Sequence, residues 1–214
     1  MELASWPFYT EEEIEEVKNV LNSGQVNYWT GNQTNFFEKE FAKEIGVDYA
    51  VAFANGTLAL SAAYLALGIK KGDEIITTPR TFIATASTIL LIGAKPVFAD
   101  VDINSGNITA KNIKPLINKS TKAISVVHLG GWPAEMESIC NLAKQYGLLI
   151  LEDCSQAHGA SYRGKQIGSY GDISTWSFCQ DKIISTGGEG GMVTTNNFGF
   201  YKKVWSLKDH GKSL

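Results

Sequence analysis

Two side chains in the second half of the chain have the chemistry to bind one cofactor from opposite sides. Lys182 lies in a glycine-rich loop beside the apolar residues Ile183 and Ile184. Asp153 follows the apolar run 148–151, where we predict that a buried strand ends. Apolar neighbours lower the pKa of an amine, which favours Schiff-base chemistry, and a carboxylate can pair with a protonated pyridine nitrogen. The pair predicts a pyridoxal 5'-phosphate site.

Asp153 alone has an equally good structural explanation, because an aspartate after a strand often caps the next turn. Its neighbours add weight to the cofactor hypothesis. Gln156, three residues on, could donate a hydrogen bond to the phenolic oxygen of the ring. His158 could support the site or serve as a hydrogen-bonded structural histidine, and the sequence leaves both open.

The other polar residues of interest also lie where strands are predicted to end. Asn55, Gly56 and Thr57 form a strand-to-helix junction, where free N–H groups and the helix dipole favour phosphate; a plain capped turn would look the same. Ser177 could bind the phosphate from the other side. Phe82 could stack on the cofactor ring, but its residue type and position alone favour a core phenylalanine.

The cysteines predict no metal site. Cys140, Cys154 and Cys179 are odd in number and lack metal-type spacing, so we expect reduced thiols. Cys154 and His158 leave open a thiol–imidazole pair of a hydrolase. The glycines at 187–191 match neither a dinucleotide nor a phosphate-loop pattern and predict close backbone approach instead.

Alternating strand and helix patterns must position these residues. They predict an α/β fold with a mostly parallel seven-stranded sheet and helices on both faces. One of the last three strands is expected to run antiparallel, because only loops join them. The predicted strands are 49–53, 74–77, 96–99, 123–128, 148–151, 173–178 and 192–195, and the helices between and after them are 58–67, 82–92, 110–117, 136–146 and 198–208.

A helical segment is predicted ahead of the sheet. Thr10 and Glu13 form a capping box for a first helix, and Thr34 is expected to cap a second. We therefore divide the chain into an N-terminal segment of about 1–46 and an α/β sheet region of 47–214. No linker or repeat separates them, so one compact domain is expected.

Composition excludes several classes of partner. The chain has 214 residues and a net charge of −3, and no basic run exceeds two residues, so nucleic acid and acidic membranes are poor candidates. No apolar stretch is long enough to span a bilayer, and the acidic start does not resemble a signal peptide. We expect a cytoplasmic protein.

Six motifs, in order, make the sequence similar to the DegT/DnrJ/EryC1/StrS family of sugar-nucleotide aminotransferases. They are FANGTLAL, TPRTFIATAS, VHLGGWPAEM, EDCSQAHGA, GSYGDISTWSFC and DKIISTGGEGG, and they extend over nearly the whole chain. The resemblance implies the large domain of a fold type I pyridoxal-phosphate transferase. It also implies that the smaller C-terminal domain is missing from this chain.

The resemblance assigns a role to each candidate residue. Lys182 matches the Schiff-base lysine, which groups the chain with transaminases rather than with the dehydratases that carry histidine there. Asp153 matches the partner of the pyridinium nitrogen, and Gln156 the residue near the phenolic oxygen. The remaining matches are the stacking aromatic Phe82 and the phosphate contacts Gly56, Thr57 and Ser177.

The resemblance also implies substrates and assembly. L-glutamate would donate its amino group to a keto sugar linked to a nucleotide, yielding amino sugars for O-antigen, lipopolysaccharide or related polysaccharides. A homodimer is implied, because the missing region supplies an asparagine to the cofactor phosphate of the neighbouring subunit. An alternative is a catalytically incomplete fragment with a role only in folding or dimerisation.

Overall fold

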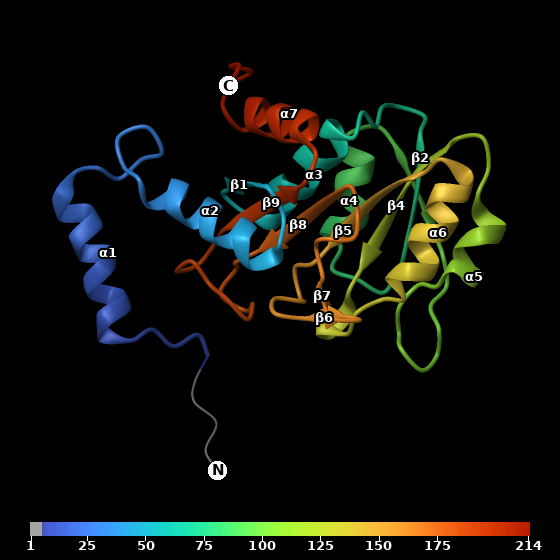
Figure 1. Ribbon diagram of the computed structural model, residues 1–214, viewed down its shortest axis with the longest axis horizontal. Coiled ribbons are helices and arrows are strands. Elements are labelled where there is room, and N and C mark those ends of the chain that lie inside the picture. The colour runs from blue at the N-terminus through green and yellow to red at the C-terminus, as the bar shows by residue number, and fades with distance from the viewer. Residues whose placement is uncertain (1–5) are drawn as a thin grey trace, which may run out of the picture.

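The computed structural model describes residues 6–214 and is built around a seven-stranded sheet (Figure 1). The strand order is β1-β9-β8-β5-β4-β2-β3. Residues 1–5 of the predicted N-terminal segment lie outside the described residues. The strands are β1 (Tyr49–Phe53), β2 (Glu74–Thr77), β3 (Lys95–Phe98), β4 (Thr121–Val127), β5 (Leu149–Asp153), β8 (Ile173–Ser177) and β9 (Gly191–Thr195).

β9 is the reversed strand of this sheet, which agrees with the prediction that one of the last three strands runs antiparallel. It pairs antiparallel with β1 and with β8, whereas the pairings among β3, β2, β4, β5 and β8 are all parallel. Phe53 of β1 and Ser177 of β8 both pair with Gly191, the first residue of β9. The carboxyl ends of β1 and β8 therefore meet at the start of β9, on one edge of the sheet.

Successive strand residues belong to two separate apolar cores, as expected when side chains alternate between faces. Ile75 and Leu151 lie in one core, and their neighbours Ile76 and Ile150 lie in the other. Helices therefore cover both faces, as predicted. The first core takes side chains from α3 (Gly56–Ala66), α4 (Ala84–Leu91) and α7 (Phe198–Lys208), and the second from α2 (Gln33–Ile45), α5 (Ala110–Ile113) and α6 (Met136–Tyr146).

The two N-terminal helices differ in how they pack. Thr10 and Glu13 form the predicted capping box of α1 (Glu11–Ser23), but α1 buries none of its residues and extends away from the sheet (Figure 1). The predicted cap of α2 is wrong. Asn32 occupies the N-cap position without a side-chain hydrogen bond, and Thr34 lies inside the first turn.

Two further differences from the predicted elements are local. The helix predicted over 110–117 is divided into α5 and a 3-10 turn, η1 (Lys114–Leu116), which carries Pro115 in its first positions. A proline lacks the N–H that would continue an α-helix, so a change of helix type there is expected. A small hairpin of β6 (Ser161–Tyr162) and β7 (Lys165–Gln166) connects β5 to β8 and was not predicted.

Within residues 6–214, none of the helices combines the length and apolar character that crossing a bilayer requires.

Candidate active site

A cavity of about 380 Å³ opens at the edge of the sheet where the parallel strands have their carboxyl ends. This is the usual position of a ligand site in an open α/β sheet. Its walls come from the segments that follow β1, β2, β5 and β8. Every residue predicted for the site lines this one cavity: Gly56, Thr57, Phe82, Asp153, Gln156, Ser177 and Lys182.

Asp153 is the last residue of β5 and is only 4% exposed. The strand continues two residues further than predicted, because Glu152 and Asp153 pair with β4. The Asp153 carboxylate accepts two hydrogen bonds. Thr85 Oγ1 donates to one oxygen at 2.8 Å, and the Ser155 N–H donates to the other at 3.2 Å. The acid is thus fixed at the cavity wall, with capacity for a further donor.

Thr85 is a site residue that the sequence analysis missed. It lies in the first turn of α4, and its hydroxyl also hydrogen-bonds with Thr81 at 2.9 Å. A threonine that is buried in a helix must find a hydrogen-bond partner, and this signal could have identified it.

Lys182 lies in the loop between β8 and β9, where its N–H donates to the Cys179 carbonyl. Its side chain is 17% exposed, and Nζ lies 3.0 Å from Asp181 Oδ2. That hydrogen bond, more than any other contact, lowers the pKa of Asp181. The prediction that Ile183 and Ile184 make the surroundings of the Lys182 amine apolar is wrong, because these two side chains are 58% and 44% exposed. The walls of the cavity, rather than these neighbours, enclose the amine.

The start of α3 forms the end of the cavity that could hold a phosphate. Asn55 is the N-cap, and its side chain accepts from the Leu58 N–H at 2.9 Å. The N–H groups of Gly56 and Thr57 precede the first intrahelical bond and remain free to donate to an anion. A Cβ at position 56 would lie 2.9 Å from Ser177 Cβ, so glycine permits the helix to approach the end of β8.

Phe82 and Gln156 line the remaining walls. Phe82 is 65% exposed, so the core position that its residue type favoured is wrong. The side-chain oxygen of Gln156 accepts from the Gly130 N–H at 2.7 Å. A backbone N–H can only donate, which identifies the bonded atom as oxygen and leaves the amide NH₂ group of Gln156 available.

The geometry argues against a Cys154–His158 hydrolase pair. Cys154 is fully buried, and burial together with Glu152 and Asp153 raises its pKa well above the ordinary value. The thiol therefore stays protonated and inaccessible. His158 packs against Trp176, and burial, followed by the charge of Lys182, lowers its pKa to about 4. Within residues 6–214, neither ring nitrogen of His158 has a hydrogen-bond partner.

Comparison with known proteins identifies the fold and the family together. The model of the DegT/DnrJ/EryC1/StrS aminotransferase family matches residues 7–214. The chain belongs to this family. Its members are sugar aminotransferases, and the family's cofactor is pyridoxal phosphate or its pyridoxamine form.

Individual relatives agree with this assignment. GDP-perosamine synthase of Escherichia coli O157:H7 is 43% identical over 208 residues, which are 97% of this chain and 57% of that protein. The aminotransferase from Psychrobacter cryohalolentis is 54% identical, with a TM-score of 0.97 over 98% of this chain and 53% of that one.

NtdA from Bacillus subtilis, solved with bound cofactor PMP, is 31% identical and has a TM-score of 0.86 over 96% of this chain and 48% of its own. The chain thus spans about half the length of the relatives that it matches.

The cavity fits the cofactor of this family chemically. It presents a buried acid for a pyridinium nitrogen, an amine for a Schiff base, free helix N–H groups for a phosphate and an exposed aromatic ring for stacking. The close approach that Gly56 permits between α3 and Ser177 brings together the groups that could donate to a phosphate.

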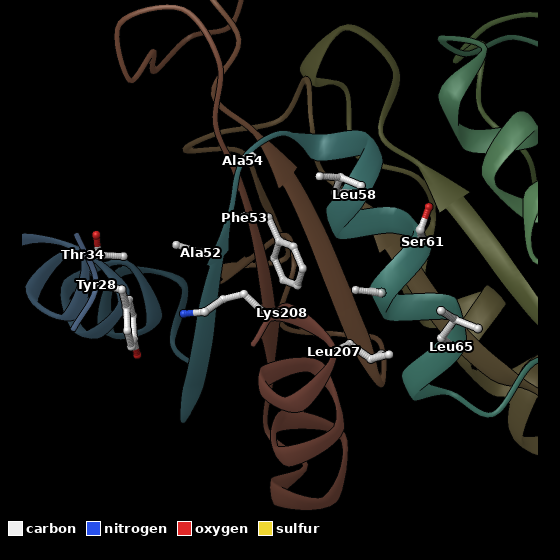
Figure 2. A pocket seen from close by; sticks show the side chains of 11 residues that line it. Tyr28, Thr34, Ala52, Phe53, Ala54, Leu58, Ser61, Leu65, Leu207 and Lys208 are labelled. Carbon is white, nitrogen blue, oxygen red and sulfur yellow. The ribbon is translucent and has the colours of Figure 1, made fainter. Parts of the chain in front are cut away.

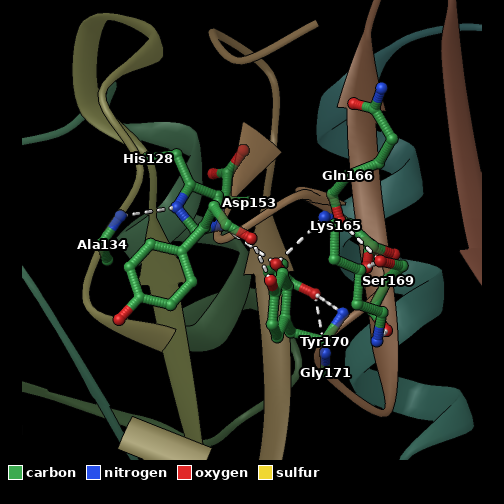
Figure 3. A network of polar contacts seen from close by, with 12 residues as sticks. His128, Ala134, Asp153, Lys165, Gln166, Ser169, Tyr170 and Gly171 are labelled. Carbon is green, nitrogen blue, oxygen red and sulfur yellow. Dashed lines mark hydrogen bonds and ion pairs between the residues drawn. The ribbon is translucent and has the colours of Figure 1, made fainter. Parts of the chain in front are cut away.

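A buried carboxylate lies directly beside the site, on the opposite face of β5. Glu152 is fully buried, and its two oxygens accept from His128 Nε2 and from the N–H groups of Gly168, Tyr170 and Gly171 at 2.7–3.1 Å (Figure 3). Burial raises the pKa of Glu152, but the hydrogen bonds, first that of His128, outweigh burial and hold that pKa below its ordinary value.

The His128 ring is fixed from both sides. The Ala134 N–H donates to Nδ1 at 3.1 Å, so Nε2 carries the proton that is donated to Glu152 (Figure 3). Cys154 lies close enough for the three side chains to resemble a metal site. We assign them to a hydrogen-bonded network instead, because both imidazole nitrogens are already engaged and the thiol is protonated.

A second cavity, of about 590 Å³, lies between β1, α3 and α7, apart from the candidate site (Figure 2). Lys208 Nζ lies 3.7 Å from Glu38 and 3.3 Å from the centre of the Tyr28 ring. Burial is the main cause that raises the pKa of Glu38 and lowers that of Lys208. The remaining walls are largely apolar.

Proposed function

We propose that the protein is a pyridoxal-phosphate-dependent aminotransferase that transfers an amino group from L-glutamate to a keto sugar linked to a nucleotide. The observation that carries the proposal is the convergence of seven residues, separated in the sequence, on one cavity at the carboxyl edge of the sheet. Family membership and the name of the nucleotide-sugar enzyme GDP-perosamine synthase support the substrate class.

Each residue has a defined task in this proposal. Asp153, oriented by Thr85 and Ser155, accepts a hydrogen bond from the ring nitrogen and keeps it protonated. Phe82 stacks on the ring, and the NH₂ group of Gln156 donates to the phenolic oxygen. The phosphate is held by the start of α3 and by a hydroxyl of β8, through Gly56, Thr57 and Ser177.

Lys182 performs two tasks. Its amine attaches the cofactor covalently, and once released it carries a proton from and to the α-carbon of the amino donor. Bound pyridoxal phosphate supplies the electron sink that makes this proton acidic. Asp181, 3.0 Å from Nζ, holds the amine in the cavity before attachment.

The wider assignment follows from the same family resemblance. We propose a cytoplasmic homodimer in which a second subunit completes the site. Its products would be amino sugars for lipopolysaccharide, O-antigen or related polysaccharides. A role only in folding or dimerisation is the alternative.

The attachment site can be tested directly. The protein is incubated with pyridoxal phosphate, reduced with borohydride and digested, and the modified lysine is located by mass spectrometry. We expect the label on Lys182, its loss in Lys182→Ala and its retention in Lys165→Ala, which removes an exposed lysine that donates to the Ser169 carbonyl. A label on any other lysine, or none, would refute the assignment.

Turnover separates catalysis from the alternative. Glutamate-dependent amination of a panel of keto-sugar nucleotides is measured with the same protein. Conversion that disappears in Lys182→Ala supports the enzyme, whereas a labelled Lys182 without conversion of any substrate favours the non-catalytic alternative.

A further inference from the structure

The loop of residues 129–134, between β4 and α6, is fixed by buried polar side chains that have no task in the chemistry described above. It contains Gly130 and Gly131, both in the left-handed region at φ 60° and 81°. A Cβ at Gly131 would lie 3.1 Å from the backbone oxygen of Gln156, so the loop passes directly against the segment after β5.

Asn107 fixes the loop at two points. This side chain, which is 2% exposed, comes from the segment between β3 and α5. Its oxygen accepts from the Leu129 N–H at 3.2 Å, and its NH₂ group donates to the Trp132 carbonyl at 2.8 Å. An amide side chain provides both the acceptor and the donor that these two bonds require.

His128 fixes the far end of the loop. Its Nδ1 accepts from the Ala134 N–H, and its ring is in turn held by Glu152. The imidazole is completely buried and both of its nitrogens are hydrogen-bonded, so it has one orientation and one tautomer. The backbone of the loop is therefore bound at Leu129, Trp132 and Ala134.

Between these points lies Gly130, whose N–H donates to Gln156 at 2.7 Å. We propose that Asn107 and His128 are positioning residues that act through this N–H: they fix the 129–134 loop so that Gly130 sets the Gln156 amide with its NH₂ group toward the cofactor's phenolic oxygen. The inference deepens the proposed function and rests on it. Without Gly130, the amide could rotate and present its oxygen to an oxygen anion.

The orientation has a spectroscopic consequence. An N–H donor stabilises negative charge on the phenolic oxygen, and it does so most when the neighbouring nitrogen, supplied by Lys182, has lost its proton. The amide therefore lowers the pH at which the visible band of the bound cofactor changes. Loss of one hydrogen bond to a charged group should raise that midpoint by about one pH unit or more.

The experiment uses two variants and a matched control. Gln156→Glu keeps an oxygen for the Gly130 N–H but removes the NH₂ donor. Asn107→Asp keeps the acceptor for the loop but removes the donor to it. Asn112→Asp is the control, because the Asn112 side chain donates to the Asp100 carbonyl at 2.9 Å and, within residues 6–214, forms no hydrogen bond with the loop.

The first measurement is hydrogen exchange of the 129–134 amides without cofactor. We expect exchange about tenfold faster or more in Asn107→Asp, with wild-type rates in Asn112→Asp and in Gln156→Glu. Gln156→Ala should accelerate Gly130 alone, which keeps the loop testable if Asn107→Asp fails to fold. Unchanged exchange in both Asn107→Asp and Gln156→Ala would overturn the proposed linkage.

The second measurement is the pH midpoint of the visible band of pyridoxal phosphate bound at Lys182. We expect Gln156→Glu to raise it by about one unit or more, Asn107→Asp to raise it by about half as much, and Asn112→Asp to leave it unchanged. Faster exchange in Asn107→Asp with a wild-type midpoint would show that the loop has only a structural role, and would overturn the positioning proposal. A wild-type protein that binds no cofactor refutes the proposed function instead, while the exchange rates still decide whether the loop is linked to Gln156.

Discussion

Replacement of Glu152 by glutamine tests whether the buried carboxylate holds the segment after β7 against the sheet. The carboxylate accepts four hydrogen bonds, two at each oxygen, from Gly168 and His128 on one side and from Tyr170 and Gly171 on the other. Glutamine offers one oxygen and one NH₂ group. Whichever way the amide lies, two buried N–H donors then face a donor.

The expected loss can be derived from these contacts. A hydrogen bond to a charged group contributes about 1.5–3 kcal/mol, so losing two destabilises the protein by about 3–6 kcal/mol. This is a large fraction of the roughly 5–15 kcal/mol that stabilises a typical domain. With a urea m-value of about 2–3 kcal/mol/M, the unfolding midpoint should fall by about 1–3 M.

The assay is urea unfolding followed by circular dichroism, with Glu137→Gln as the control. Glu137 forms an exposed ion pair with Arg163, so its replacement should change stability by less than about 1 kcal/mol. A Glu152→Gln protein as stable as this control would refute the reasoning, because it would mean that the four donors do not depend on a carboxylate.

The pH dependence gives a second check on the same carboxylate. The folded pKa of Glu152 lies below its ordinary value of 4.5. Its stabilising contribution is therefore fully present above pH 4.5 and is lost as the pH falls through the folded pKa. The stability difference between wild type and Glu152→Gln should shrink below pH 4.5, and a constant difference would contradict the assignment.

Three further outcomes are expected. Thr85→Val removes the hydroxyl donor of Asp153 and should weaken pyridoxal-phosphate binding about tenfold in an absorbance titration, whereas Thr88→Val, which loses only a bond within α4, should not. Iodoacetamide should label Cys154 only after unfolding, as detected by mass spectrometry, because the buried thiol has a raised pKa. Gly191→Ala places a methyl group 2.4 Å from backbone atoms of the α3 cap and should lower the urea-unfolding free energy by at least about 2 kcal/mol.

The sequence predicted the sheet well because its strands are short runs of β-prone residues that are bounded by clear breaks. All seven strands lie within two residues of their predicted bounds, and the reversed strand β9 was among those expected from the loop lengths. The β6–β7 hairpin was missed because each of its strands has only two residues, too few to show a period.

The sequence predicted which residues belong to the candidate site, but not how their side chains are arranged. Residue types and positions at strand ends identified seven of the residues that line the cavity. They did not reveal Thr85 beside Asp153 or Asp181 beside Lys182, because such pairs depend on how a helix and a loop turn in space. The Ile183 and Ile184 side chains were wrongly expected to enclose the amine, since adjacency in a loop does not imply packing.

The adjacent acids at the end of β5 explain why the fold and the chemistry meet at this strand. Successive strand residues point to opposite faces, so Glu152 and Asp153 must serve different environments. Glu152 binds His128 and the segment after β7, whereas Asp153 lines the cavity. The backbone N–H of His128 also donates to the backbone carbonyl of Asp153 at 3.3 Å. The network that fixes the back of the sheet therefore also fixes the backbone that carries Asp153, and exchanging the two residues should disrupt both the network and the cavity wall.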